Sequence, residues 1–292
     1  MNPPAEAYFG DGDNRLCYFE WGNPDGPVIL LLHATGFHAR CWDKVVAALP
    51  SDHRVIAVDQ LGHGRSAKPE TIIDWSENAR ALGGLIEGLE LRDIVGAGHS
   101  MGGHCLVQLA GQMGARFKRL VLIDPVIMEP SLYEGVPPLG ELDPSENPVS
   151  RRRAHWDSPE QMINRLKDHP SYSVWDPDVL DDYCRYGLLP RDGGDGFDLA
   201  CPPFLEASIY TGSRSTNPYP MVDQISMPVT ILRAPRGERR AAVDFTRSPT
   251  WPGLADRFAN GTDVFMPELT HFLPMQDPKR IARYIAGLSP DA

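Results

Sequence analysis

The sequence predicts an α/β fold, in which a mostly parallel sheet carries helices on both faces. Short apolar runs alternate along the chain with segments whose apolar residues recur at helical spacing. One long stretch, 125–224, has no buried-strand pattern and is too long to be a simple loop. We therefore expect a core made of residues 1–124 and 225–292, with residues 125–224 inserted as a helical cap.

The first part of the core supplies the regular alternation. An edge strand is expected over 15–21, and continuous apolar runs predict strands buried on both faces. Apolar stripes at helical spacing predict helices around residues 42–49, 75–89 and 106–113. The buried strands are expected at 28–32, 55–58, 94–95 and 120–123, and they lead into His33, Asp59, Ser100 and Asp124. Ligands on parallel sheets bind at this carboxyl edge, so these four side chains are candidates for a site.

The rest of the chain returns to the sheet after the insertion. Within the insertion, helices are expected around 160–166 and 177–186. Strands are expected at 229–232 and 263–266, and a helix begins after Asp277. Large aromatic side chains of the insertion are expected to form an inner face that closes over Ser100. They are Trp156, Tyr172, Trp175, Tyr183 and Tyr210.

Composition narrows the class of partner. The chain has 28 basic and 39 acidic residues, a net charge of −11, which argues against nucleic acid or an anionic membrane surface. A neutral small-molecule substrate fits this balance better. Five scattered cysteines without C-x-x-C spacing indicate neither disulfides nor zinc, so we expect a cytoplasmic protein. There is no apolar run of membrane-spanning length and no secretory pattern at the start of the sequence.

The stretch Gly98-His99-Ser100-Met101-Gly102 has the G-x-S-x-G spacing of a nucleophile elbow. A serine held on a sharp turn between strand and helix needs neighbours without side chains two residues to either side. Here a β-branched apolar pair precedes the motif and a helical pattern follows it. This context predicts that Ser100 is a nucleophile.

Taken together, these segments resemble the α/β-hydrolase superfamily over nearly the whole chain. The resemblance rests on His33-Ala34-Thr35-Gly36, the segment 59–66, the elbow at Ser100, and Leu269-Thr270-His271-Phe272. It implies an eight-stranded, mostly parallel sheet, a cap inserted after the sixth strand, and a triad in the order nucleophile, acid, histidine. Epoxide hydrolases and haloalkane dehalogenases carry aspartate at the elbow, so the serine disfavours both chemistries.

The resemblance also implies roles for other residues. His271 is the candidate base, and the amides of Met101 and Thr35 are the candidate oxyanion donors. Residues near the strand ends are candidates for an apolar substrate pocket: Phe37, Val126, Ile127 and Phe272. We expect His33, His99 and His104 to be structural, and neither a metal site nor a cofactor is indicated.

The third member of the triad stays open between three carboxylates. Asp124 ends a buried strand next to the elbow strand, where a partly buried carboxylate is well placed to hold the histidine. Relatives more often place the acid after the strand expected at 229–232, where this chain offers Glu238 and, further on, Asp244.

These residues predict a serine hydrolase that cleaves an ester or related acyl bond of a small, largely apolar substrate. The same triad also serves carbon–carbon bond hydrolases, lactonases, amidases and perhydrolases. A ligand receptor that retains the scaffold is the non-enzymatic alternative. Fold alone does not separate these activities.

Overall fold

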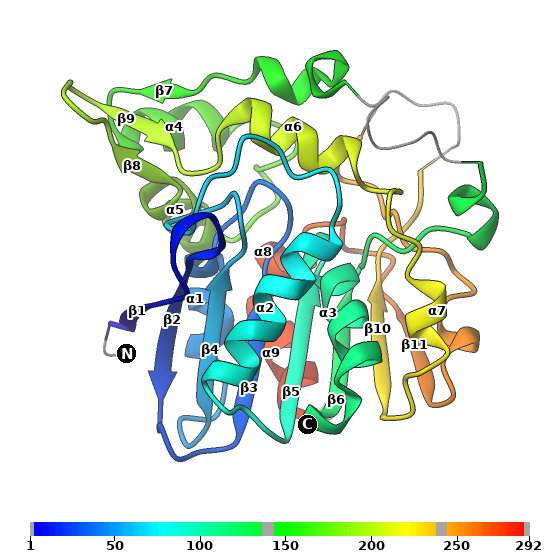
Figure 1. The fold of residues 1–292 in the computed structure, drawn as a ribbon. Coiled ribbons are helices and arrows are strands. Elements are labelled where there is room, and N and C mark those ends of the chain that lie inside the picture. Colours follow the sequence, from blue (N-terminus) through cyan, green and yellow to red (C-terminus); the bar gives the residue numbers. More distant parts are fainter. Residues whose placement is uncertain (1–2, 136–142, 238–243, 289–292) are drawn as a thin grey trace.

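The computed structural model describes residues 3–135, 143–237 and 244–288, built around an eight-stranded sheet (Figure 1). The strand order is β1-β2-β4-β3-β5-β6-β10-β11, with β1–β2 and β2–β4 antiparallel and all other pairs parallel. The strands are β1 (Ala5–Phe9), β2 (Leu16–Gly22), β3 (Val28–Leu32), β4 (Arg54–Asp59), β5 (Ile94–His99), β6 (Phe117–Ile123), β10 (Val229–Arg233) and β11 (Gly261–Phe265). The predicted α/β class and eight-stranded sheet are confirmed.

Helices cover both faces of the sheet. On one face lie α2 (Ser76–Gly88), α3 (Met101–Gln112) and α7 (Tyr219–Val222). On the other lie α1 (Asp43–Ala47), α8 (Leu273–Gln276) and α9 (Pro278–Ala286) (Figure 1). Successive side chains of a strand point to opposite faces, so Leu30 and Leu32 pack under α2 and α3, while Ile29 and Leu31 pack under α1 and α9. Both faces are apolar, which explains the continuous apolar runs.

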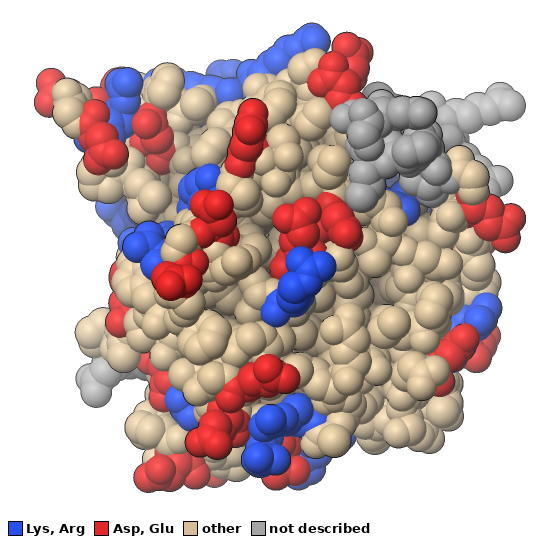
Figure 2. Space-filling model, in the orientation of Figure 1, with Lys and Arg blue, Asp and Glu red and all other residues tan. Residues whose placement is uncertain are grey.

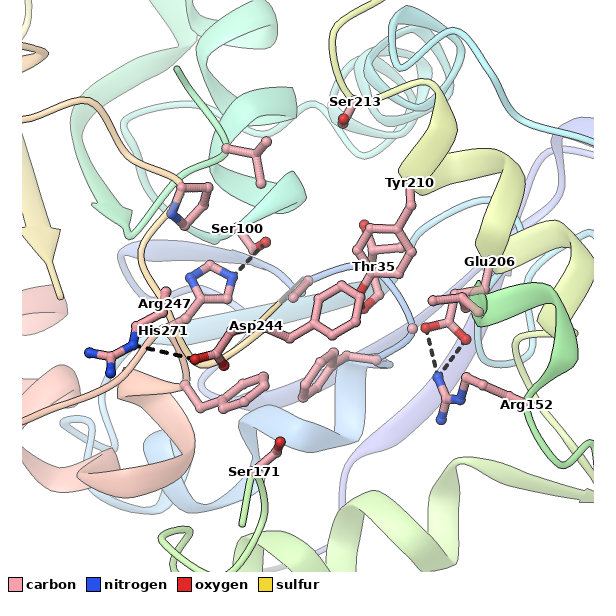
Figure 3. A pocket seen from close by; sticks show the side chains of 18 of the residues that line it. Thr35, Ser100, Arg152, Ser171, Glu206, Tyr210, Ser213, Asp244, Arg247 and His271 are labelled. Carbon is pink, nitrogen blue, oxygen red and sulfur yellow. Dashed lines mark hydrogen bonds and ion pairs between the residues drawn. The ribbon is translucent and has the colours of Figure 1, made fainter. Parts of the chain in front are cut away.

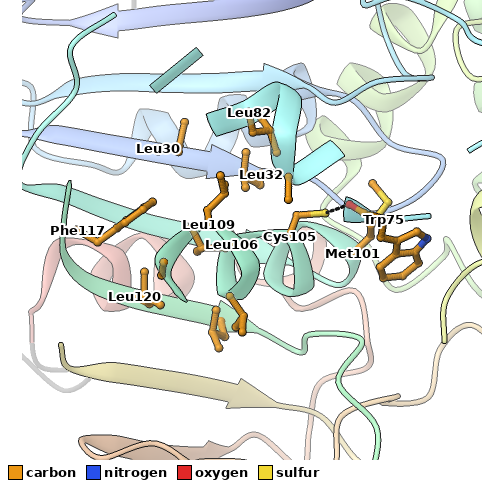
Figure 4. Close-up of a cluster of buried hydrophobic side chains, with 14 of the residues drawn as sticks. Leu30, Leu32, Trp75, Leu82, Met101, Cys105, Leu106, Leu109, Phe117 and Leu120 are labelled. Carbon is orange, nitrogen blue, oxygen red and sulfur yellow. Dashed lines mark hydrogen bonds between the residues drawn. The ribbon is translucent and has the colours of Figure 1, made fainter. Parts of the chain in front are cut away.

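The cluster around α3 fixes the helix that follows Ser100 (Figure 4). Leu106 packs so closely on β5 that a Cβ on Gly96 would lie 2.7 Å from its Cδ1. Full burial of each such leucine contributes roughly 1.5–3 kcal/mol of stability. The α3 side chains in the cluster are Met101, Cys105, Leu106, Val107, Leu109 and Ala110. The start of α3 is therefore a rigid platform.

We call the elements of the inserted stretch 125–224 that lie above the sheet the cap. The cap lies over the carboxyl ends of the parallel strands (Figure 1). Two of its helices, α4 (Pro159–Leu166) and α5 (Pro177–Tyr186), occupy the ranges the sequence predicts. A third helix, α6 (Pro203–Thr211), is additional. So is a three-stranded sheet in the order β7 (His155–Trp156), β9 (Phe197–Leu199), β8 (Leu188–Pro190). Strands of two or three residues are too short to show a period in the sequence.

Short 3₁₀ turns join the larger elements. They are η1 (Gly12–Asn14), η2 (Ala39–Trp42), η3 (Gly114–Arg116), η4 (Pro130–Tyr133), η6 (Pro144–Glu146), η7 (Pro148–Arg151) and η8 (Ala255–Arg257). The helix expected around Trp42 thus begins as η2 and continues as α1.

The edge strand differs from the sequence expectation. The edge of the sheet is β1, because β2 pairs on both sides, with β1 and with β4. Parts of the inserted stretch pack against the core: Ile127 and Tyr219 from its two ends, and Leu205 and Ile209 from α6, all belong to the α3 cluster. The helices α4, α5 and α6 of this stretch lie above the sheet (Figure 1).

Acidic and basic side chains are interspersed on the face shown in Figure 2, where most of the coloured surface is neither. Among the described residues, the helices are too short or too polar to cross a bilayer.

Candidate active site

Ser100 occupies the elbow that its neighbours predict. Its backbone has φ 57° and ψ −117°, a strained conformation for a residue with a side chain. The flanking glycines make the turn possible: a Cβ on Gly98 would lie 2.5 Å from the Gly102 carbonyl oxygen, and one on Gly102 would lie 2.7 Å from that of His33. The turn therefore presents the Ser100 hydroxyl above the edge of the sheet.

Three side chains from distant parts of the chain meet at this edge. The Ser100 Oγ lies 3.0 Å from Nε2 of His271, and Nδ1 of His271 lies 2.7 Å from Oδ2 of Asp124 (Figure 3 shows the first two residues). All three are buried, with Asp124 fully so and the other two exposed by less than a tenth. A serine, an imidazole and a carboxylate in this order form the hydrogen-bonded chain that activates a hydroxyl.

Asp124 is held by the loop that follows β10. Its backbone has φ 45°, and its N–H donates to the Leu232 carbonyl at 2.7 Å. Its Oδ1 accepts from the Ala234 amide at 3.1 Å and from the Ser248 hydroxyl at 2.6 Å, which leaves Oδ2 for the histidine. A buried carboxylate is stable only when its oxygens are bonded in this way.

The other two candidate acids do not reach the histidine in the described structure. Asp244 lies at the cavity wall and accepts from the Thr246 amide at 2.9 Å and from Arg247 Nε at 3.3 Å. Glu238 lies outside the described residues. Of the candidates that can be placed, Asp124 is the one bonded to His271.

The backbone around His271 is fixed from two sides. Its amide donates to the Thr246 carbonyl at 2.8 Å, and its carbonyl accepts from Nε2 of His99 at 2.8 Å. Burial and the neighbouring His271 hold the pKa of His99 well below its usual range. A neutral His99 therefore supports His271 without repelling the positive charge that a catalytic imidazole acquires.

The loop after β3 is braced by two other histidines. Nδ1 of His33 bonds to the Ala34 carbonyl at 2.8 Å, and the Gly36 amide donates to Nε2 of His63 at 3.0 Å. Within the described residues, the amides of Thr35 and Met101 donate to no protein acceptor. Both candidate oxyanion donors are thus unused in the folded chain.

Above Ser100 a cavity of about 560 Å³ lies between the cap and the core. Three of the four predicted pocket residues line it: Phe37, Val126 and Phe272. Ile127 does not, and this prediction is wrong. The Ile127 amide donates to the Pro125 carbonyl at 2.8 Å, which closes a tight turn with Val126 at its corner. The side chain of Ile127 therefore lies in the core.

The cap aromatics divide into two groups. Tyr172, Tyr183 and Tyr210 line the cavity, as the sequence predicts. Trp175 instead stacks on Phe37 with ring centroids 5.6 Å apart and does not line the cavity. Trp156 is buried within the cap cluster. Trp156 therefore stabilises packing within the cap, and Trp175 stabilises packing of the cap on the core.

Several residues of the site carry no signal in the sequence. Arg152 and Glu206 form an ion pair in the wall, and Ser248 bonds to Asp124. Arg152 and Ser248 lie in irregular segments, where spacing does not indicate which way a side chain points. Glu206 lies on α6, a helix that was not predicted from the sequence. Among the described residues, no group of three or more His, Cys, Asp or Glu side chains is placed to hold a metal ion.

The site combines a strained serine, a histidine bonded to it and an acid bonded to that histidine, at the carboxyl edge of a mostly parallel sheet. This combination defines the class of α/β hydrolases. The chain belongs to the alpha/beta hydrolase family, whose model matches residues 29–284.

Curated relatives match parts of the chain. An uncharacterised protein of Mycobacterium tuberculosis is 37% identical over 98 residues, which is 34% of this chain and 29% of that protein. A non-heme chloroperoxidase of Streptomyces lividans is 32% identical over 151 residues, or 50% of this chain and 54% of that protein. The chain thus matches about a third to a half of the length of these relatives.

Solved structures match the whole fold at low identity. An E-2-(acetamidomethylene)succinate hydrolase has a TM-score of 0.76 at 22% identity, covering 99% of this chain and 100% of that one. The thioesterase domain of a curacin biosynthetic pathway has 0.74 at 19%, covering 97% and 99%. A thermophilic esterase of Thermogutta terrifontis has 0.66 at 21%, covering 97% of each.

Proposed function

We propose that this chain is a serine hydrolase that cleaves an ester or related acyl bond through an acyl-enzyme on Ser100. The observation that carries the proposal is the continuous hydrogen-bonded chain from Ser100 through His271 to Asp124 at the base of a cavity. Solved structures of similar fold include an esterase and a thioesterase domain, which is consistent with acyl transfer.

In the proposed first step, His271 Nε2 takes the proton of Ser100 as Oγ attacks the substrate carbonyl. The Asp124 carboxylate stabilises the imidazolium through Nδ1. The amides of Met101 and Thr35 would bind the oxyanion of the tetrahedral intermediate. Collapse expels the leaving group, which takes the proton from His271, and Ser100 keeps the acyl group as an ester.

The second step repeats this chemistry with water. His271 removes a proton from the water as its oxygen attacks the acyl-enzyme carbonyl. The intermediate then releases the acid, and the Ser100 oxygen recovers its proton from His271. This sequence balances without an external oxidant, reductant or cofactor.

The substrate is proposed to be small and largely apolar. The cavity of about 560 Å³ has the size of a site for one small molecule. Phe37, Val126 and Phe272 supply apolar walls near the proposed nucleophile. We also propose a cytoplasmic location, which is supported by five buried cysteines that are all free thiols.

The proposal is tested with an active-site probe and a substrate series. Wild type should be labelled covalently by a fluorophosphonate and should hydrolyse p-nitrophenyl esters. Ser100→Ala should keep its circular dichroism spectrum and unfolding midpoint and lose both properties. Folded wild type that resists labelling and cleaves no ester would overturn the proposal and favour the receptor alternative.

A further inference from the structure

The cavity has a polar end on the side away from Ser100 and His271 (Figure 3). Arg152, which follows η7, and Glu206, on α6, line the cavity there. Neither residue takes part in the proposed acyl transfer. A charged pair inside an apolar cavity is costly to desolvate, so it calls for a reason other than stability.

The two side chains of this pair differ in their exposed fraction. Nη1 of Arg152 donates to both carboxylate oxygens of Glu206, at 2.7 and 2.5 Å. The Glu206 side chain is only 3% exposed, whereas that of Arg152 is 28% exposed. Gly36 lies against the carboxylate, and a Cβ there would overlap Oε1. Glu206 is therefore enclosed, and Arg152 is the partner that a ligand can reach.

Arg152 keeps hydrogen-bonding capacity after these contacts. A guanidinium has five N–H donors. Nη1 bonds to Glu206 and Nη2 donates to the Tyr183 hydroxyl at 3.3 Å, while Nε donates to no protein acceptor within the described residues. The polar end thus offers donors to a ligand, while the acceptors of Glu206 are already used.

The charge at this end is balanced before any ligand arrives. Glu206 neutralises Arg152, and Arg247, at the end of the cavity nearer to His271, is paired with Asp244 at 3.3 Å (Figure 3). A carboxylate brought to Arg152 would also approach Glu206 and would lose its hydration without gaining an unpaired cation. A neutral oxygen acceptor meets the free donors without this penalty.

We propose that Arg152 selects substrates with a neutral oxygen acceptor, such as an amide or ketone carbonyl, at the end remote from the scissile acyl bond. This inference rests on the proposed function and refines its substrate class: a mostly apolar chain with a polar, uncharged terminus. Arg152 binds this terminus and Glu206 keeps the guanidinium in place.

The test compares esters that differ only at the remote end. One series consists of p-nitrophenyl esters varied in the acyl part, and the other of acetate esters varied in the alcohol part. In each series the varied part has a range of chain lengths and ends in a methyl, a primary amide or a carboxylate. In wild type, we expect the amide to exceed the methyl in kcat/KM by roughly ten- to a hundredfold in at least one series, as befits a hydrogen bond to a charged group. The carboxylate should rank below the amide.

The variant removes both charges, because Arg152→Met alone would leave Glu206 buried without a partner. Arg152→Met with Glu206→Gln should lower the ratio of kcat/KM for the amide to that for the methyl toward one, and a general loss of activity would leave this ratio unchanged. Arg185→Met is the matched control, since this cap arginine pairs with Glu160 and Asp181 outside the cavity. It should keep the preference.

Each other outcome is decisive. Wild type that cleaves all three ends equally, or a double variant that keeps the preference, would overturn the inference and leave the proposed function standing. A preference for the carboxylate would show that the terminus is anionic and would also overturn it. Failure of wild type to cleave any ester or react with fluorophosphonate would instead contradict the proposed function.

Discussion

Asp124 differs from the other candidate acids in how its carboxylate is surrounded. It is fully buried, with one oxygen bonded to Ala234 and Ser248 and the other to His271. Asp244 is exposed and bonded to its own loop through Thr246 and Arg247. A carboxylate orients a catalytic imidazole only if its own position is fixed, and this condition favours Asp124.

Asp124→Asn should lower kcat for a p-nitrophenyl ester by thousands-fold while leaving the fold intact. The amide is nearly isosteric, but it presents the wrong hydrogen-bonding pattern to Nδ1 of His271, and such a change in a serine triad costs on the order of 10⁴-fold. The measurement is steady-state turnover together with a urea unfolding curve.

Asp244→Asn and Glu238→Gln are the controls for this substitution, and both should keep most of the activity. A large loss in either one, with Asp124→Asn still active, would assign the acid to the later loop.

Sequence reasoning reached some residues of the candidate site and missed others for a local reason. Ser100 lies in a motif whose glycines can be read directly, because the turn needs them. The acid is chosen by contacts between segments that are far apart in the chain, such as Ser248 with Asp124, and no spacing rule records these. Arg152 and Glu206 escaped notice for the same reason.

At the scale of elements, the contact of α5 with α1 links the cap to the core. Asp182 on α5 lies 3.3 Å from the ammonium group of Lys44 on α1 and is mostly buried. Burial, with a smaller contribution from Asp43, raises the pKa of Asp182 to about 6 despite Lys44. The cost of burying its charge thus exceeds the gain from its partner.

This shift predicts a pH-dependent stability with a definite sign. The pKa of Asp182 in the folded state is raised above its value in the unfolded chain. The contribution of this group to stability is therefore fully present below about pH 4 and is lost as pH rises through about 6. Asp182→Asn should therefore raise the thermal unfolding midpoint at pH 7.5 and change it little at pH 4.

Asp181→Asn, which alters a surface residue paired with Arg185, should show no such trend. A larger loss of stability for Asp182→Asn at pH 7.5 than at pH 4 would mean that the Lys44 attraction dominates.

Elements were predicted best where they are long or buried on both faces. The runs that became β3 and β4, and the stripes of α2 and α5, carry strong periodic signals. In contrast, β1 has mostly exposed residues and the cap strands span only two or three, so hydrophobic pattern did not reveal them.

For the whole molecule, five buried histidines make the stability depend on pH. Burial lowers the pKa of His33, His38, His63, His99 and His104, to about 4 for His38 and His104. The folded state keeps these rings neutral, while the unfolded chain binds protons once pH falls below about 6.5. The contribution of these histidines to the free energy of unfolding is fully present above about pH 6.5. It is lost as pH falls below that value toward their folded-state pKa values.

We expect the free energy of unfolding to fall steeply between pH 6.5 and 5, by about 1.4 kcal/mol per pH unit for each histidine that stays neutral only when folded. Urea unfolding at a series of pH values measures this slope. His104→Gln should reduce the slope by about one histidine's share. A stability that is flat over this interval would contradict the prediction.

The three proposed catalytic residues are far apart along the chain, so they are synthesised at different times. Ser100 and Asp124 lie on neighbouring strand ends in the first half of the sequence, but His271 follows the last strand, after the whole cap. During synthesis from the amino terminus, the nucleophile and the acid exist for more than a hundred residues before their base is made. A growing chain, or one that has lost the segment after β11, would hold a serine with nothing to take its proton, so reactivity would appear only once folding is nearly complete.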